Sequence, residues 1–425
     1  MSSIVWAVMV LLLVIGLPIG FALMAISIVL LGISGVTTPF AIAQKTVTSL
    51  SSFTMLAIPF FMLAGEAMSK TGVSKKIFDF AGSLVRHLPG GMAHVNVLTS
   101  VFLAGCSGSA VADITGVGRL EIEAMEDAGM DRDFAAATTA ATACVAPIIP
   151  PSMSMVIYAS ISGVSVGKML FGGIGPGIML AIAFMIYCYL YSKKHHFPTQ
   201  PHVKAKELGS SFVKAIPALM LPIIILGGIL SGVFTATEAA AGGAFYAILL
   251  GMLLYRNLSF KGLMEILGNA GILCATTFCI MYGSSVFGMV LTVNHIPQAL
   301  CDFFVNLSDT RWVVVVAVNI MLLVLGMLMD CTPILLILSG TLALLAHEIG
   351  MDPVQFGVMV VFNVTVGLAT PPVGMALFVT QKVADISTKR MFKSILPFLV
   401  VMITVLFIVA FVKPITTFIP NLLIK

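Results

Sequence analysis

A short polar stretch interrupts long apolar sequence near residue 107. Residues 103–113 read L-A-G-C-S-G-S-A-V-A-D, and no Lys, Arg, Asp or Glu occurs from Gly90 to Ala112. Hydroxyl, carbonyl and carboxylate oxygens are the ligands that hard cations prefer. In a bilayer, broken backbone of this kind survives only where it is buried in protein or lines a watery cavity. We therefore expect this stretch to form the tip of a re-entrant hairpin that enters a transport site.

Three further interruptions combine polar residues with proline or glycine. They read A-P-I-I-P-P-S-M-S at 146–154, G-M-L-M-D-C-T-P at 326–333 and N-V-T-V-G-L-A-T-P-P-V-G at 363–374. A Pro-Pro pair removes two amide donors and disfavours helix before it, which exposes carbonyl oxygens. Such carbonyls can bind Na⁺, and half-helix N-termini can hold an anion. The alternative is that the prolines only kink helices and the small residues only pack them. Because the four interruptions occupy symmetric positions, we favour a binding site over simple kinking and packing.

Single residues in these interruptions carry the candidate chemistry. Asp330 is a carboxylate between apolar runs, and intramembrane carboxylates are costly and functional by default. It could coordinate a cation, cap the helix that starts at Cys331, or bind a substrate hydroxyl. Asp113 could instead cap the arm that follows it. The candidate Na⁺ ligands, with at least one site in each half of the chain, are Gly105, Ser107, Pro147, Pro150, Gly326, Asp330, Gly367 and Thr370.

Composition defines the class of protein that must position these residues. The 425 residues are 59% hydrophobic and only 9% charged, with a mean hydropathy of +1.10, whereas a soluble domain is about a quarter charged. This predicts an all-α polytopic membrane protein in contact with lipid. A net charge of +4 gives no reason to expect a nucleic-acid partner. No phosphate-binding loop points to ATP, and no nucleophile–base pair or metal triad points to an enzyme.

The two halves of the chain echo each other. The interval from Gly105 to Gly326 is the same as the interval from Pro150-Pro151 to Pro371-Pro372, and we call it the repeat interval. It predicts a tandem repeat with three crossings before each hairpin and two after it, so that the second repeat is inverted. The expected units are a first repeat at 1–192 with a hairpin at about 92–118, a cytoplasmic linker at 193–214, and a second repeat at 215–425 with a hairpin at about 312–347.

Charge predicts the orientation. With the N-terminus outside, all but five of the 22 Lys and Arg residues fall inside, the five being Lys45, Lys168, Arg311, Lys413 and Lys425. Basic residues are retained on the cytoplasmic side, so both termini are expected outside. Residues 4–16 are expected to be a mature membrane helix, not a signal peptide. Segments 73–88 and 258–268 are expected in the interface, and the charges from Arg119 to Arg132 in a solvated cytoplasmic loop.

The motifs resemble the large membrane subunit of the tripartite ATP-independent periplasmic (TRAP) transporters along essentially the whole chain. The matching stretches are I-P-F-F-M-L-A-G (58–65), A-G-C-S-G-S-A-V-A-D (104–113), A-P-I-I-P-P-S (146–152), G-V-F-T-A-T-E-A-A (232–240) and T-P-P-V-G (370–374). The resemblance implies Na⁺-driven secondary transport in the bacterial inner membrane, with periplasmic termini and an elevator motion of a transport domain against a scaffold. It also implies two partners: a small four-helix membrane subunit (Q type) and a periplasmic substrate-binding protein (P type).

The resemblance further implies a carboxylate substrate. Five positions look like those implicated in sialic-acid carriers: Ser107, Ser109, Asp113, Ser154 and Asp330. We therefore expect import of sialic acid (N-acetylneuraminate), with a C4-dicarboxylate or a sugar acid as alternatives. A self-sufficient divalent-anion/Na⁺ symporter with a similar fold is the alternative without a binding protein. An intramembrane enzyme is the alternative of another class.

Overall fold

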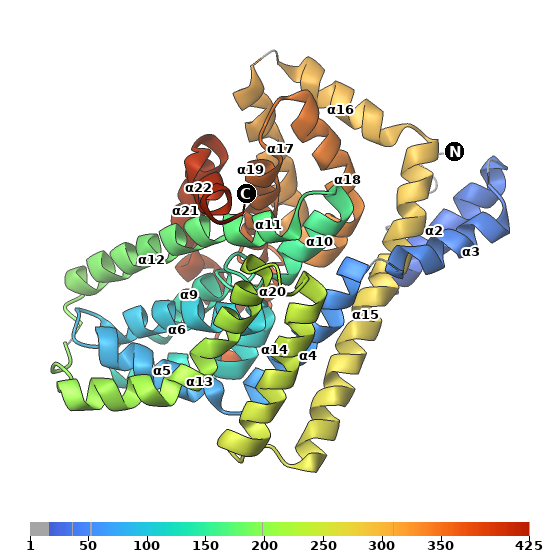
Figure 1. Cartoon of the computed structure of the whole chain (residues 1–425). Coiled ribbons are helices and arrows are strands. Elements are labelled where there is room, and N and C mark those ends of the chain that lie inside the picture. Colours follow the sequence, from blue (N-terminus) through green and yellow to red (C-terminus); the bar gives the residue numbers. More distant parts are fainter. Residues whose placement is uncertain (1–16, 36, 52, 198, 309, 425) are drawn as a thin grey trace.

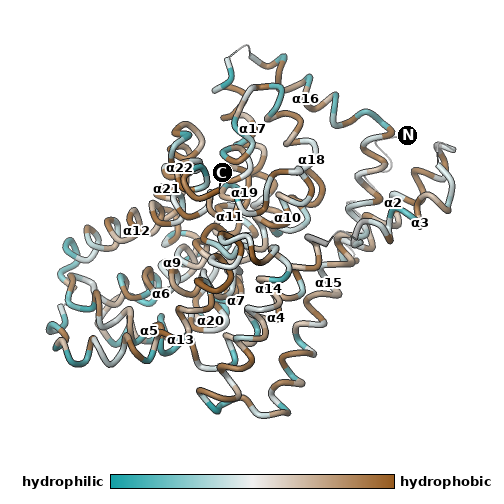
Figure 2. Tube along the Cα trace, viewed as in Figure 1, coloured by the Kyte–Doolittle hydropathy of each residue, from teal (hydrophilic) through white to brown (hydrophobic). Residues whose placement is uncertain are grey.

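The computed structural model describes residues 17–35, 37–51, 53–197, 199–308 and 310–424. All regular structure within these ranges is helical, and the expected segment 4–16 lies outside them. Among the described residues, seven helices are long and apolar enough to cross a membrane. Figure 2 shows hydrophobic residues along most helices, with hydrophilic colour concentrated at their ends and connections. The predicted class, an all-α polytopic membrane protein, is confirmed.

The first half forms a series of helices that ends at Lys194 (Figure 1). These are α2 (Ile19–Ser34), α3 (Pro39–Leu50), a 3₁₀ turn (Phe53–Leu56), α4 (Ala57–Lys70), α5 (Val73–Val85), α6 (Gly91–Ser107), α7 (Ala110–Asp113), a π-helical turn η2 (Ile114–Gly118), α8 (Arg119–Asp127), α9 (Arg132–Ala143), α10 (Met153–Ser162), α11 (Val166–Gly172) and α12 (Ile174–Lys194). Helix α6 and the continuous arm α7–η2–α8 form hairpin 1. Helices α9 and α10 are the two parts of broken helix 1.

The second half repeats this order. It comprises α13 (Ala205–Leu230), α14 (Ala236–Leu249), a π-helical turn η3 (Leu250–Leu254), α15 (Phe260–Val293), α16 (Ile296–Leu307), α17 (Arg311–Leu328), α18 (Cys331–Glu348), α19 (Pro353–Leu368), α20 (Met375–Ala384), α21 (Thr388–Phe411) and α22 (Pro414–Leu423). Helices α17 and α18 form hairpin 2, within a residue or two of the expected 312–347. Helices α19 and α20 form broken helix 2.

Helix boundaries in the two halves recur at the spacing of the sequence landmarks. Helices α3, α7 and α9 begin one repeat interval before α15, α18 and α19. The residues that precede α7 and α18, Ser109 and Asp330, keep the same interval and are both N-cap residues. Both Pro-Pro bonds are cis. The repeat therefore extends through the hairpins and the broken helices.

Three boundaries differ from the sequence expectations. The connection between α12 and α13 is limited to 195–204, because no proline follows Lys204 before Pro217 and the polar first turns of α13 are exposed. The second arm of hairpin 1 continues through α8 to Asp127, beyond the expected end near 118. Segment 258–268 is not a separate interfacial helix, since α15 runs unbroken for 34 residues. At about 1.5 Å per residue it is longer than the roughly 30 Å hydrocarbon core.

The two halves interlock instead of folding side by side. Helix α2 packs against α15, and α14 packs against α4. Figure 1 shows α2 and α3 beside the upper part of α15, away from the group formed by α5, α6, α12 and α13. The broken helices also contact the other half of the chain. Helix α10 packs against α18 of hairpin 2, and α20 packs against η2 of hairpin 1.

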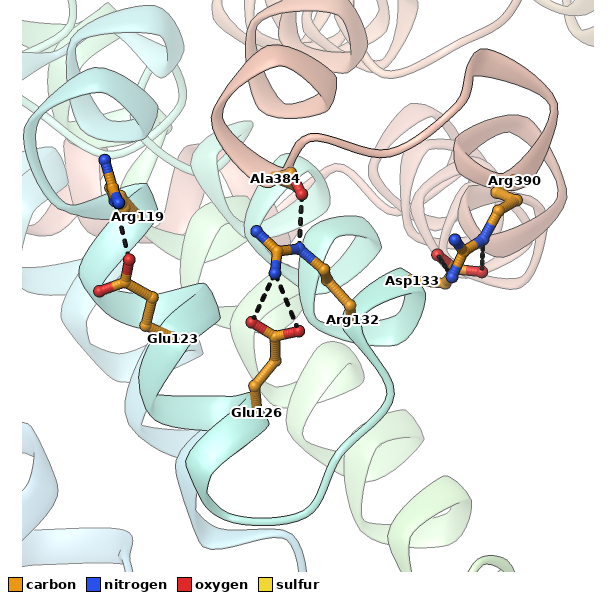
Figure 3. A network of polar contacts seen from close by, with 7 residues as sticks. All are labelled: Arg119, Glu123, Glu126, Arg132, Asp133, Ala384 and Arg390. Atoms are coloured by element: carbon orange, nitrogen blue, oxygen red, sulfur yellow. Dashed lines mark hydrogen bonds and ion pairs between the residues drawn. The ribbon is translucent and has the colours of Figure 1, made fainter.

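A polar network joins the base of hairpin 1 to the second half (Figure 3). The Arg132 Nε atom donates a hydrogen bond of 2.6 Å to the Ala384 carbonyl, and the same guanidinium pairs with Glu126. Arg390 contacts both carboxylate oxygens of Asp133, each at 2.8 Å. Bidentate pairs of this kind fix orientation as well as distance. The network therefore ties α8 and α9 to α20 and α21.

Candidate functional site

The tip of hairpin 1 is a tight turn held by a serine–aspartate contact. Helix α6 ends at Ser107, Gly108 takes the left-handed conformation (φ +59°), and Ser109 begins the next arm as its N-cap. The Ser107 hydroxyl donates to Asp113 Oδ1 at 2.5 Å. Asp113 is only 5% exposed, and its Oδ2 atom has no hydrogen-bond partner. The tip therefore contains a buried carboxylate oxygen that is free to accept a hydrogen bond or to bind a cation.

A small cavity lies beside this carboxylate. It is lined by residues of α4, α6 and the second arm, including Ser69, Ser107, Asp113 and Gly116. Its volume of about 10 Å³ admits the centre of a single particle of the size of water. A hydroxyl, a carboxylate and a confined space of this size suit one small cation or one water molecule.

The same tip rests on the break in the first interrupted helix. A Cβ atom added at Gly108 would lie 2.5 Å from the Pro151 carbonyl oxygen, so the two backbones touch. Within the break, Ser152 is the N-cap of α10 and accepts a hydrogen bond from the Met155 amide. Its hydroxyl donates to the Pro147 carbonyl oxygen. The sequence reasoning did not single out Gly108, although Gly between two serines is a turn signal.

The tip of hairpin 2 has the same place in its repeat but a different conformation. Met329 is extended (φ −135°, ψ 156°), and Asp330 is the N-cap residue of α18. The Asp330 carboxylate faces the amides of Cys331 and Thr332 without the geometry of a side-chain cap. The residue is half-buried. Capping, one of the three roles considered for Asp330, is thus incomplete in this structure.

Hairpin 2 also closes on the break of its own repeat. A Cβ atom added at Gly367 would lie 2.5 Å from the Gly326 Cα atom, so α17 and α19 are in backbone contact there. The Gly374 amide donates to the Met327 carbonyl at 3.4 Å. A Cβ atom added at Gly374 (φ +37°) would lie 2.8 Å from the Leu368 carbonyl oxygen and 2.9 Å from the Thr370 carbonyl oxygen. The structure thus brings Gly326, Gly367 and Thr370 into one region.

The predicted site residues of the first half do not all lie in one region. Ser107, Ser109 and Asp113 share the tip, and Pro147 and Pro150 share the break beneath it. Ser154 is buried in the first turn of α10. Gly105 abuts the ring of Pro222 in α13, because a Cβ atom there would lie 2.9 Å from the Pro222 Cβ atom.

Hydrogen bonds of buried asparagine side chains brace both hairpins. Of these asparagines, only Asn363 lies in a stretch that the sequence singled out. In hairpin 1 the Thr142 hydroxyl donates to Asn96 Oδ1 at 2.5 Å. In hairpin 2 the Asn363 Nδ2 atom donates to Asn319 Oδ1 at 2.6 Å. Thr142 and Asn363 are counterparts, separated by the repeat interval. A lone Asn within an apolar run was the available signal for Asn96 and Asn319.

The expected cytoplasmic loop from Arg119 to Arg132 is wrong in two respects. Residues 119–127 form α8, and Glu121 on that helix is only 2% exposed. The charges that stay in solvent are on the opposite face, where Arg119 pairs with Glu123 at 2.7 Å. A run of mixed charges looks solvated in a sequence, whereas an amphipathic helix buries one member of it.

Together these elements define a class of protein. Two hairpin tips and two broken helices supply four helix N-termini, unwound carbonyls and two carboxylates inside a polytopic helical bundle. Helix N-termini attract anions, and unwound carbonyls and carboxylates attract cations. Paired broken helices of this kind are typical of secondary transporters.

Comparison with known proteins gives the family. The family model described as "Tripartite ATP-independent periplasmic transporter, DctM component" matches residues 6–415. The chain is 39% identical to the sialic acid TRAP transporter large permease protein of Vibrio cholerae, over 96% of this chain and 95% of that protein. It is 37% identical to the 2,3-diketo-L-gulonate TRAP transporter large permease protein of Escherichia coli, over 94% of both. The chain belongs to the family of TRAP transporter large permeases, and it is a transport protein, not an enzyme.

A solved structure supports the fold independently of close sequence identity. The crystal structure of the Alcanivorax borkumensis YdaH transporter is similar with a TM-score of 0.62, at 12% identity, over 87% of this chain and 88% of that one. At this identity the likeness concerns the fold alone. It agrees with the arrangement of the helices described above.

Proposed function

We propose that this chain is the large membrane subunit of a Na⁺-coupled importer of a carboxylate in the bacterial inner membrane. The observation that carries the proposal is that each hairpin tip closes on the broken helix of its own repeat. Both termini face the periplasm, a small four-helix subunit lies alongside, and a periplasmic binding protein delivers the substrate. The hairpin-bearing part moves against the rest as an elevator.

Two Na⁺ sites follow from the two tips. In the first, Ser107 and the backbones of Gly105, Pro147 and Pro150 provide ligands, and the unpartnered Oδ2 atom of Asp113 and the adjoining 10 Å³ cavity support an ion at this tip. The second is formed by Asp330 with the backbones of Gly326, Gly367 and Thr370. Oxygen donors and carboxylates are the groups that hold a hard cation, so the residues present fit Na⁺.

The substrate is sialic acid, bound through its carboxylate and hydroxyls by Ser107, Ser109, Asp113, Ser154 and Asp330. Similarity to a relative named for sialic acid supports this choice. A sugar acid is the second candidate, favoured by the relative named for 2,3-diketo-L-gulonate. A separate cleft of about 940 Å³ lies between α3, α10, α15 and α18, and none of the five proposed substrate residues lines it. Lys45, His347 and six serines and threonines line it, and no carboxylate does.

Uptake into proteoliposomes tests the proposal. The chain is reconstituted with its small subunit, and labelled sialic acid, 2,3-diketogulonate and a C4-dicarboxylate are offered with the cognate binding protein. We expect uptake of sialic acid only, and only with an inward Na⁺ gradient and the binding protein present. Uptake unaffected by removing Na⁺ would refute the coupling. Uptake of free solute without the binding protein would instead indicate a self-sufficient symporter.

A further inference from the structure

Hairpin 1 contains three buried titratable side chains that hairpin 2 lacks. His94, Asp113 and Glu121 are 1%, 5% and 2% exposed. Their counterparts one repeat interval later are apolar and equally buried, namely Val315, Ile334 and Leu342. The second hairpin shows that this backbone packs with apolar side chains at all three positions. Packing therefore does not account for a carboxyl group at position 121.

Within the described part of the chain, Glu121 has a single hydrogen-bond partner. The Asn96 amide donates to its Oε2 atom at 3.1 Å and to the Thr139 hydroxyl at 2.8 Å. The Oε1 atom is buried without a partner. Asn96 is held in turn by the Thr142 hydroxyl. The carboxyl group thus receives one neutral N–H and has one oxygen unused.

No cation compensates a charge on Glu121. Helix α8 packs against α6, η2, α9 and α20. The titratable and charged side chains that these elements and the adjoining α7 present, with those of α8 itself, are His94, Asp113, Arg119, Glu123, Glu126, Asp127, Arg132, Asp133 and Lys382. Each arginine among them is engaged elsewhere, Arg119 by Glu123 and Arg132 by Glu126. Among the described residues, no ion pair includes Glu121.

We propose that Glu121 is a proton-binding site built into hairpin 1, where Oε1 carries the proton. An ionised carboxylate without a counter-charge is strongly disfavoured in a dry interior, and such a group neutralises by binding a proton. The packed hairpin therefore keeps a proton that an exposed glutamic acid, with an ordinary pKa of about 4.3, has already lost at neutral pH. By linkage, the packed arrangement is favoured at low pH and loses stability as the pH rises. Deprotonation loosens the packing of α8 on α6 and α9, a response that the apolar counterpart Leu342 does not give to hairpin 2.

Infrared spectroscopy of the chain in lipid bilayers tests the site without reference to any solute. At neutral pH the difference spectrum between the wild type and Glu121→Gln should contain the carbonyl stretch of a protonated carboxylic acid, and so should the difference between the wild type and Glu121→Leu, whatever band buried Asp113 contributes to all three. Glu123→Gln is the matched control, because Glu123 lies on the same helix in an exposed ion pair. The absence of this stretch from both difference spectra would overturn the proposal.

The pH profile of thermal unfolding provides the second readout. Above the ordinary glutamate pKa of about 4.3, titration of Glu121 should lower the wild-type unfolding temperature as the pH rises. Glu121→Gln imitates the protonated acid and should flatten this profile. Glu121→Leu, the residue found in hairpin 2, should flatten it as well and serves if the amide variant does not fold. Glu123→Gln should retain the wild-type slope, and an unchanged slope in both Glu121 variants would contradict the proposal.

Discussion

Hairpin 1 and hairpin 2 follow the same backbone plan with different chemistry. Both turn just before an N-cap residue, and both close on a cis Pro-Pro break. Hairpin 1 turns through a left-handed glycine at 108, whereas hairpin 2 turns through the extended Met329. Hairpin 1 buries a serine-bound Asp113 in its arm, where hairpin 2 has Ile334. The repeat thus preserves helix boundaries and leaves the side chains free to diverge.

A second pair of regions supports the same conclusion. The 3₁₀ turn Phe53–Leu56 lies between helices α3 and α4, whereas their counterpart α15 is continuous from Phe260 to Val293. Segment lengths agree between the repeats although the helix is broken in only one. The two halves therefore share the path of the chain, while each half places its own breaks and its own charges.

The largest expected effect comes from the turn that only hairpin 1 uses. Gly108→Ala adds a Cβ atom at φ +59° within 2.5 Å of the Pro151 carbonyl. We expect a cost of at least about 2 kcal/mol, or roughly 30-fold in the population of the native tip. Uptake in proteoliposomes should fall accordingly. Met329→Ala is the matched control, because extended backbone accepts alanine, and equal losses in both variants would remove the distinction between the tips.

An intermediate effect is expected at the two polar tips. Ser107→Ala removes the donor to buried Asp113 and should cost about 1–3 kcal/mol. Uptake should fall and the Na⁺ concentration for half-maximal rate should rise. Asp330→Ala should also impair Na⁺-driven uptake, while Asp330→Ser, which installs the residue type of position 109, should retain more of it because a serine can cap α18. Normal Na⁺ dependence in both alanine variants would argue against ion sites at the tips.

The smallest effects are expected at the ion pairs of Figure 3. Arg119→Ala removes an exposed pair within α8 and should leave the unfolding temperature unchanged, because such pairs are screened by solvent. Arg132→Ala should lower it measurably, since Arg132 also donates to the Ala384 carbonyl of the other half. Thermal unfolding of both variants in the same detergent compares them. A larger loss for Arg119→Ala would contradict the role given to the network.

The sequence predicted much of the fold for clear physical reasons. Long apolar runs indicated membrane helices, and prolines and glycines indicated where they break. The sequence did not predict that α15 is continuous. The turns before residue 268 are polar, and in the sequence they resemble a separate helix at the membrane interface. It did not predict α8 or the burial of Glu121 either, because the face that a charged helix turns inward depends on its neighbours.

The sequence by itself determined the class of protein, the repeat and the residue types at the four interruptions, since composition and spacing are local properties of the chain. Only the tertiary structure decided which of those residues meet. It placed Gly326 against Gly367 but turned Gly105 toward Pro222, and it left one oxygen of Asp113 and one of Glu121 without a partner. The reason is physical: contacts between residues far apart in the chain depend on how the two halves interlock.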